Sequence, residues 1–525
     1  MMMYKKTAIV IGSGVAGTFI ATQLLQYKLY EKVIMLEAGP EFKMGDYGQW
    51  LHYVTGGSAP YESHYDTEED FTAKGIQPWY LNGSRIFGKG GSTLHFGGWL
   101  PRFKPEDFEL HQNTGRGIDW PFNYDELEPY YCEAETYLGV TGDSQNQNPP
   151  RSRPFPYEAA PYPLVAKPFI KAFDTLSLSY QHLPITRYGK AENGHGKCLT
   201  AGTCNYCPVD GKFNGMQPFR TLDPQSNFEL RLESPVIKLL MSAQDTVQGV
   251  SYYDIKQQRV KHLEGDAVFI CSGALEAPKL LLNSRNKFWP QGIGNNHDLV
   301  GRYLSANPFF YAAGQTTSAN HYQCELGFPT FASRHFDSKA FQTQGKFFMA
   351  MDNDSARIDF VTSMLAGKSP EAIQAQISGQ KTLQLFGNLE PLPFWENRVY
   401  PDKEWTKHFL PKTIIDTPKA MYDPNIADFY VEQMHSVLKK MGLENIRTGT
   451  YPQRGDHAAC TCRMAHSPEQ GVVNTDFTVH GVNNVYILSN AILPTLPAAN
   501  PTLTLVAMGY KMIADMRKQM LLHAA

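Results

Sequence analysis

The sequence carries no strong excess of charge and no long apolar run. Its 48 Lys and Arg residues nearly balance 51 Asp and Glu residues, which leaves a formal net charge of −3 at pH 7. Such a balance supplies no basic field that would attract nucleic acid or an anionic membrane. No stretch reaches the roughly 18 consecutive apolar residues that a transmembrane helix needs. We therefore expect neither a nucleic-acid partner nor a transmembrane segment.

Cysteine is scarce, and a secretion signal is missing from the start of the sequence. Eight cysteines in 525 residues are too few for a disulfide scaffold. The first apolar segment, residues 8–11, runs directly into a glycine-rich turn, with no cleavage-like site behind it. We expect a cytoplasmic protein, or one exported only together with a signal-bearing partner. The length suggests two or three domains.

The glycine-rich turn after residues 8–11 is the most informative feature of the N-terminal part. The apolar run is typical of a buried parallel strand. Gly12, Gly14 and Gly17 then fit the pattern G-x-G-x-x-G. In that pattern the glycines allow a tight turn, close approach of a pyrophosphate, and close packing of a helix on a strand.

The residues that follow complete a βαβ unit. Residues 18–30 are expected to form a helix, and residues 32–36 a second apolar strand. Glu37 lies twenty residues past Gly17, where an acidic side chain accepts the ribose hydroxyls of an adenosine. The helix N-terminus offers unpaired N–H groups to the phosphates. The unit predicts a bound dinucleotide and leaves NAD and FAD both open.

A second glycine-rich loop, F-G-K-G-G-S-T-L-H-F-G-G, occupies residues 87–98. Its glycines let the backbone lie flat against a planar ligand, and Ser92 and Thr93 offer hydroxyls. The loop resembles the first signature of the glucose–methanol–choline (GMC) oxidoreductases, FAD enzymes in which such a loop wraps the flavin. The resemblance favours FAD over NAD and implies cofactor contacts at Gly91 and Ser92.

His95 lies inside this second loop, in the triplet Leu94-His95-Phe96. The triplet resembles the pyranose-oxidase branch of the family, in which a histidine at the matching place is bonded covalently to the flavin methyl carbon. The alternative is a histidine that only packs on the isoalloxazine ring or forms a hydrogen bond nearby. Both interpretations of His95 stay open at this point.

The C-terminal part resembles the catalytic region of the same family. His457 opens H-A-A-C-T-C-R-M-A, and residues 500–504 read N-P-T-L-T. Asn500 is a good N-cap and Pro501 suits the first helical position, so we expect a helix from there to about residue 520. The resemblance places the catalytic histidine on His457 and its partner on Asn500. An imidazole suits removal of a hydroxyl proton, and an amide can hold the alcoholate oxygen.

Further contacts with the cofactor follow from the resemblance. Residues 267–271 are expected to form a strand that leads into S-G-A-L-E-A-P-K-L-L-L, which is similar to the second GMC signature. Ser489 replaces an acidic residue of the family pattern, a change also found in the pyranose-oxidase and sugar-dehydrogenase branches. The implied cofactor-binding residues in this half of the chain are Val236, Asn490, Pro501 and Thr502.

Three cysteines crowd together in a loop at residues 196–212. Cys198, Cys204 and Cys207 follow the spacing C-x5-C-x2-C, and a proline comes after the last. Thiolates on so short a loop can converge on one soft metal centre. The sugar- and gluconate-oxidising GMC dehydrogenases carry a three-iron cluster on a comparable loop, so we hypothesise an iron–sulfur cluster here. Zinc with His195 as a fourth ligand, a disulfide and free thiols are the alternatives.

The resemblance implies an α/β fold with two domains. A Rossmann-like FAD-binding domain would combine residues 1–120, 215–305 and 447–525. An α+β substrate-binding domain with a mainly antiparallel sheet would combine residues 121–214 and 306–446.

The implied activity is FAD-dependent oxidation of an alcohol, above all a sugar or glycoside hydroxyl, with hydride transfer to flavin N5. A dehydrogenase is favoured, with a small subunit or a cytochrome as electron acceptor. The alternatives are an oxidase that uses O₂ on a non-sugar alcohol, and a GMC-type lyase with non-redox FAD.

Overall fold

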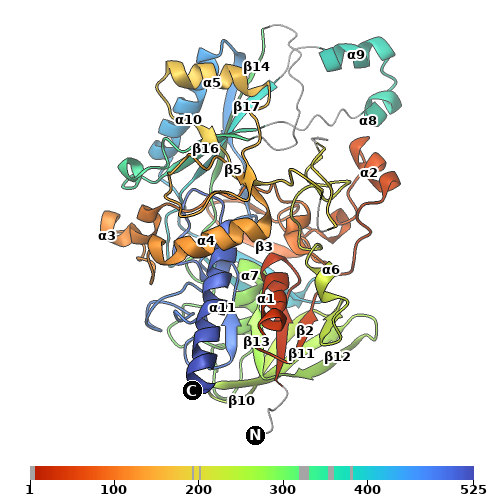
Figure 1. The fold of residues 1–525 in the computed structure, drawn as a ribbon, viewed down its shortest axis with the longest axis vertical. Coiled ribbons are helices and arrows are strands. Elements are labelled where there is room, and N and C mark those ends of the chain that lie inside the picture. The colour runs from red at the N-terminus through yellow and green to blue at the C-terminus, as the bar shows by residue number, and fades with distance from the viewer. Residues whose placement is uncertain are drawn as a thin grey trace.

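A computed structural model describes residues 6–191, 194–199, 203–317, 330–352, 360–378 and 382–524. The molecule is elongated, with a parallel sheet towards one end and a large antiparallel sheet towards the other (Figure 1). The described chain begins and ends at the end of the molecule that holds the parallel sheet. Within the described ranges, no helix has the length and apolar character that crossing a membrane requires.

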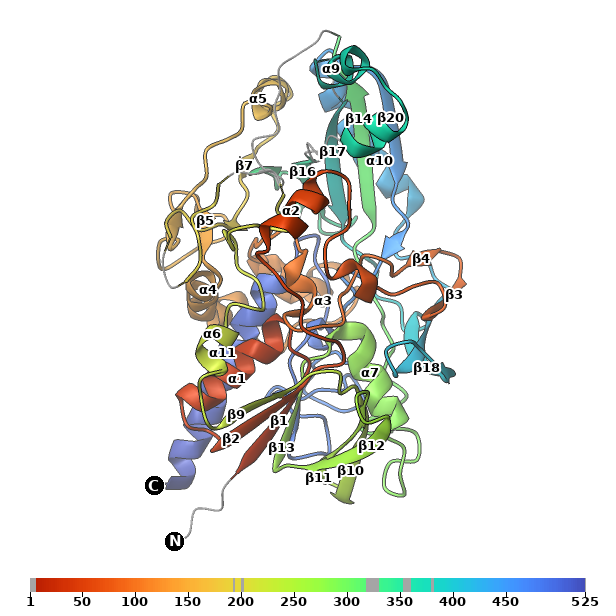
Figure 2. The same ribbon diagram turned by 90° about the vertical axis from the view of Figure 1, so that its right-hand side faces the viewer.

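The parallel sheet has five strands in the order β22-β13-β1-β2-β9. Ala8 lies opposite Ala267 on one side and Val33 on the other, and all four strand pairs are parallel. Figure 2 shows helices α1 and α11 on one side of this sheet and a three-stranded meander on the other. The strands are β1 (Thr7–Ile11), β2 (Lys32–Leu36), β9 (Phe228–Arg231), β13 (Ala267–Ile270) and β22 (Val485–Ile487), and the meander is β10 (Val236–Ala243), β11 (Thr246–Asp254) and β12 (Arg259–Glu264).

Helix α1 (Val15–Gln26) begins and ends earlier than the sequence predicted. The Gly14 carbonyl already accepts a hydrogen bond from the Thr18 N–H at 3.0 Å, so the helix starts directly after the glycine turn. Lys28 has a φ of 53°, in the left-handed region that interrupts a helix. The expected helix over residues 18–30 was therefore wrong at both ends, although its type and place were right.

The antiparallel sheet has six strands in the order β20-β14-β17-β16-β15-β7. Its faces differ because side chains alternate along each strand. Leu385 packs with Tyr430 in a core under helices α5 and α10, whereas Phe386 lines a cavity on the other side. The bounds are β7 (Gln181–His182), β14 (Phe309–Gln315), β15 (Phe331–Ser333), β16 (Phe347–Asp352), β17 (Thr382–Leu389), β20 (Glu444–Thr450), α5 (Ala166–Thr175) and α10 (Pro424–Lys440).

Smaller elements connect the two sheets. Helix α4 (Tyr124–Leu138) starts at a capping box in which Asn123 and Glu126 bond each other's backbone N–H groups. Helix α11 spans Thr502–Ala524, and α7 spans Gly273–Asn283. The remaining helices and strands are α2 (Tyr47–Val54), α3 (Leu110–Thr114), α6 (Phe219–Leu222), α8 (Phe360–Leu365), α9 (Pro370–Ser378), β3 (Phe71–Gly75), β4 (Trp79–Tyr80), β5 (Val140–Gly142), β6 (Tyr157–Glu158), β8 (Ile185–Thr186), β18 (Arg398–Trp405), β19 (Pro411–Thr417) and β21 (Gln453–Arg454). The predicted α/β class, with a mainly antiparallel second sheet, is confirmed; the domain boundaries stay a prediction.

Candidate active site

A cavity of about 780 Å³ takes its walls from both halves of the fold. It gathers residues that are more than 480 positions apart in the sequence. Eleven of the predicted catalytic and cofactor-binding residues line it: Gly12, Gly14, Glu37, Gly91, Ser92, His95, Val236, His457, Asn490, Asn500 and Thr502. Gly17 and Pro501 are not part of the lining.

Two glycine loops meet at the floor of the cavity. A Cβ on Gly91 would lie 2.8 Å from the Gly14 Cα atom, so the loops touch backbone to backbone. Gly12 has a φ of 97°, and its Cβ would lie 2.9 Å from the carbonyl oxygen of Cys271. A Cβ on Gly17 would lie 1.9 Å from the Gly12 carbonyl oxygen. Gly17 therefore allows α1 to pack on the turn, which explains why it is buried behind the cavity wall.

Glu37 braces the first glycine turn from the end of β2. Its Oε2 atom accepts hydrogen bonds from the Ser13 N–H at 2.9 Å and the Ser13 hydroxyl at 2.7 Å, and its Oε1 accepts one from the Gly39 N–H at 3.0 Å. Burial raises the pKa of Glu37, and these hydrogen bonds oppose that rise. The carboxyl group thus shapes the turn as well as facing the cavity.

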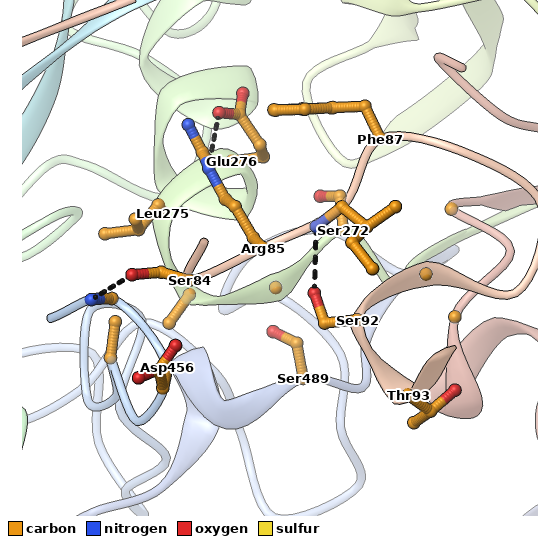
Figure 3. A pocket seen from close by; sticks show the side chains of 18 of the residues that line it. Ser84, Arg85, Phe87, Ser92, Thr93, Ser272, Leu275, Glu276, Asp456 and Ser489 are labelled. Atoms are coloured by element: carbon orange, nitrogen blue, oxygen red, sulfur yellow. Dashed lines mark hydrogen bonds and ion pairs between the residues drawn. The ribbon is translucent and has the colours of Figure 1, made fainter. Parts of the chain in front are cut away.

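Residues 84–86, which precede the second glycine loop, form hydrogen bonds both to the segment that carries His457 and to the loop itself. The Ser84 hydroxyl accepts a hydrogen bond from the Gly455 N–H at 3.1 Å, and the Ser92 hydroxyl accepts one from the Ile86 N–H at 3.2 Å (Figure 3). Between them, Arg85 forms an ion pair with Glu276 of α7 at 2.7 Å. These contacts fix both walls of the cavity with respect to each other.

His457 and Asn500 come together in the cavity as the sequence predicted. The Nε2 atom of His457 lies 3.0 Å from the Nδ2 atom of Asn500. Burial lowers the pKa of His457 to about 4, which Asp456 opposes and Arg454 assists. The ring is consequently neutral at pH 7 and able to accept a proton.

The predicted N-cap role of Asn500 was wrong. Helix α11 begins at Thr502, and the Asn500 amide bonds to His457 instead of a backbone N–H of the helix. The Pro501 carbonyl accepts a hydrogen bond from the Leu505 N–H at 3.0 Å. Pro501 therefore sets the start of the helix, and Asn500 is released to face the cavity.

Asn307 is a neighbour of His457 that the sequence did not reveal. Its Oδ1 atom lies 2.9 Å from the His457 Nδ1 atom, on the side of the ring away from Asn500. Asn307 is fully buried and lies two residues before β14. No motif marks an asparagine in such a place, so only the three-dimensional structure identifies it.

His95 lines the cavity with a hydrogen bond to Tyr65. The Tyr65 hydroxyl lies 3.0 Å from the His95 Nδ1 atom. Burial lowers the pKa of His95 to about 4, so the ring is neutral at pH 7. A neutral imidazole is a nucleophile, which suits either interpretation of this residue.

The described part of the cysteine loop shows no grouping of metal ligands. Cys198, Cys204 and Cys207 all lie in described ranges, and none of them is joined in a disulfide. Across those ranges, no three His, Cys, Asp or Glu side chains are grouped as a metal ion requires. Burial raises the pKa of the Cys207 thiol. The described residues thus show neither an iron–sulfur cluster nor a zinc site with His195, and both stay predictions.

Comparison with known proteins agrees with the geometry. The family model of the GMC oxidoreductases matches residues 395–509, which include both His457 and Asn500. Residues 395–509 of this chain therefore carry the C-terminal domain of the GMC oxidoreductases. The fructose dehydrogenase large subunit of Gluconobacter japonicus is 25% identical over 96% of both chains. The 6'''-hydroxyparomomycin C oxidase of Streptomyces lividus is 25% identical over 95% of this chain and 89% of its own.

Among solved structures, pyridoxine 4-oxidase from Mesorbium loti matches 97% of this chain over 99% of its own length, with a TM-score of 0.63 and 16% identity. That likeness shows the shared fold.

The family implies FAD, and the cavity fits it: the glycine turn and α1 offer backbone N–H groups, and Gly14 leaves the room that a side chain would fill. Glu37 and Val236 would hold the adenosine half, and Gly91, Ser92 and His95 the flavin half.

Proposed function

We propose that this GMC oxidoreductase oxidises a hydroxyl group of a sugar or glycoside. The contact between His457 and Asn500 carries the proposal, because it presents a neutral imidazole and an amide 3.0 Å apart on the cavity wall. An alcohol oxygen placed against both groups would give its proton to His457 Nε2, while Asn500 holds the oxygen. Bound FAD would supply the acceptor for the hydride that leaves the carbon bearing this hydroxyl group, and the product would be a carbonyl compound.

The proposed substrate class has two supports. Two relatives are named for fructose and for 6'''-hydroxyparomomycin C. In addition, the cavity wall is rich in aromatic rings, on which the apolar faces of a sugar ring can pack. These aromatic lining residues include Tyr65, Trp99, Phe309, Phe386 and Tyr451.

The test is an anaerobic screen of sugars, glycosides and simple alcohols for bleaching of the bound flavin. We expect a sugar or glycoside to reduce the flavin, and His457→Ala to slow reduction by at least about a hundredfold. Bleaching by simple alcohols alone would contradict the substrate class, and no bleaching by any alcohol would favour a lyase. Little peroxide in air would support a dehydrogenase over an oxidase.

We further propose that His95 holds the flavin covalently. Its neutral ring and its place in the cavity support this proposal, as does the Leu94-His95-Phe96 triplet. Acid-precipitated holoenzyme should stay yellow, and the His95→Ala variant should give a colourless pellet with its flavin in solution. A colourless pellet from the unchanged protein would refute the bond.

A partner subunit as electron acceptor is a third proposal. One relative is named a large subunit and another, the gluconate 2-dehydrogenase flavoprotein of Pantoea cypripedii, a flavoprotein. We place the protein in the cytoplasm, or outside it only with a signal-bearing partner. Purification from the native host should yield a complex with a second polypeptide, whereas a chain that runs alone and transfers electrons unaided would argue against it.

A further inference from the structure

We infer that Asn307 is a positioning residue that holds the His457 imidazole in one tautomer, with the proton on Nδ1 and the lone pair on Nε2. The inference rests on the proposed role of His457 as the base. It concerns a residue outside the catalytic pair, because Asn307 contacts His457 and does not line the cavity.

The orientation of the Asn307 amide follows from its other hydrogen bonds. Its Nδ2 atom donates to the Leu389 carbonyl at 3.1 Å and to the Pro497 carbonyl at 3.0 Å. Backbone carbonyls only accept hydrogen bonds, so the nitrogen must lie on that side of the amide. A flipped amide would bring its oxygen against both carbonyl oxygens. Two main-chain groups therefore determine that Oδ1 faces the histidine.

The tautomer of His457 follows from that orientation. The Asn307 Oδ1 atom is an acceptor only, and it lies 2.9 Å from Nδ1 of the ring. Nδ1 must therefore carry the proton and donate it. In a neutral ring Nε2 then holds the lone pair, which accepts from the Asn500 amide at 3.0 Å. The hydrogen bonds thus run in one direction, from Asn500 through His457 and Asn307 to the main chain.

Asn307 can maintain this direction of hydrogen bonding because several segments of the chain hold Asn307 itself in place. Its own carbonyl accepts a hydrogen bond from Gln453 Nε2 at 3.1 Å. Leu389 ends β17, and Pro497 belongs to the loop that leads to Asn500. On the flank of the imidazole, the ring of Phe309 packs edge-on at a centroid distance of 5.4 Å.

An amide has a further property that a carboxylate lacks in this position. Being uncharged, Asn307 fixes the tautomer but stabilises the imidazolium form far less than a carboxylate would. The charged groups that influence the ring are Asp456, which raises its pKa, and Arg454, which lowers it. Burial outweighs both, so the ring stays in its proton-accepting form. A carboxylate beside Nδ1 would raise the pKa by about one to three units.

The test compares Asn307→Ala with a matched control. Asn397 is also fully buried, and its side chain bonds the Lys419 backbone without touching a histidine. We expect Asn307→Ala to slow anaerobic flavin reduction by about tenfold to a thousandfold, as loss of a tautomer-fixing partner does. Raising the pH should not restore the rate, because a neutral ring with its proton on Nε2 is no base. Asn397→Ala should lose stability but keep the rate.

Asn307→Asp supplies the rescue, since one carboxyl oxygen can still accept from Nδ1 while the other, when protonated, donates to a main-chain carbonyl as the amide does. We expect it to recover most of the rate. Nitrogen-15 NMR of histidine-labelled protein, assigned with His457→Gln, should place the proton on Nδ1 in the unchanged protein and not in Asn307→Ala.

Three results would decide against the inference. A normal rate and pH profile in Asn307→Ala, or a proton that stays on Nδ1 in that variant, would overturn it. Nitrogen-15 shifts that place the proton on Nε2 in the unchanged protein would do the same, even if no Asn307 variant folds. A normal rate in His457→Ala would instead overturn the proposed function, which separates the two failures.

Discussion

The pH dependence of flavin reduction is the sharpest test of the site. Burial lowers the pKa of His457 from an ordinary 6.5 to about 4. Protonation removes the lone pair that takes the substrate proton, so the rate falls as the pH drops through this pKa. At pH 5 about 90% of the rings would be neutral with a pKa of 4, but only about 3% with a pKa of 6.5. The two cases differ about thirtyfold in rate.

The assay is stopped-flow reduction of the flavin under anaerobic conditions, with saturating substrate, from pH 4 to pH 8. We expect a nearly flat rate between pH 8 and pH 5 and a decline close to pH 4. Flavin absorbance before mixing serves as the control for cofactor loss at low pH. An acid limb near pH 6.5 would refute the reasoning, because it would mean that the ring is solvated rather than buried.

The other predictions concern the glycine turn that would bind the cofactor and the stability of the fold. Gly17→Ala should lower the free energy of unfolding by about 1–3 kcal/mol in urea titrations, because its Cβ would collide with backbone. Gly14→Ala should keep that stability, since its Cβ would make only an ordinary contact with the Gly91 Cα atom at 4.0 Å, but should weaken FAD binding in fluorescence titrations. Glu37→Gln should weaken FAD binding about tenfold, because its amide nitrogen would face an N–H donor. Finally, the unfolded chain binds protons on His457 and His95 below pH 6.5, whereas the folded chain binds them only near pH 4. The protein should therefore lose stability as the pH falls, by about 2–3 kcal/mol per histidine at pH 4.5 in urea titrations, and equal stability at pH 7 and 4.5 would contradict this.

Local sequence patterns predicted the residues of the dinucleotide-binding turn and the catalytic pair. Gly12, Gly14 and Glu37 occupy fixed places in a short βαβ unit, and a continuous stretch of sequence is enough to define them. His457 and Asn500 are 43 residues apart, but each is marked by its own neighbours in the sequence. The structure brings both onto one cavity wall.

Asn307 could not be predicted because its role depends on carbonyl groups far away in the chain. The Leu389 and Pro497 carbonyls that orient it are 82 and 190 residues distant. The cysteine loop is the opposite case: its spacing suggests a metal centre, but a spacing on a short loop does not say where the thiols point, and the described residues group no metal ligands there. The limits of helix α1 failed for a smaller reason, a left-handed residue at Lys28 that no propensity indicates.

The strand order of the parallel sheet has a consequence for biosynthesis. Strands β1 and β2 at its centre leave the ribosome first, but their neighbour β13 follows some 230 residues later, and the edge strand β22 comes later still. Helix α11, which covers the same sheet next to α1, is made last of all. The glycine turn of a nascent chain is therefore made long before the segments that pack around it, β13, β22 and α11. The cavity that would hold FAD is complete only in the finished polypeptide, because residues as late as Leu505 line it.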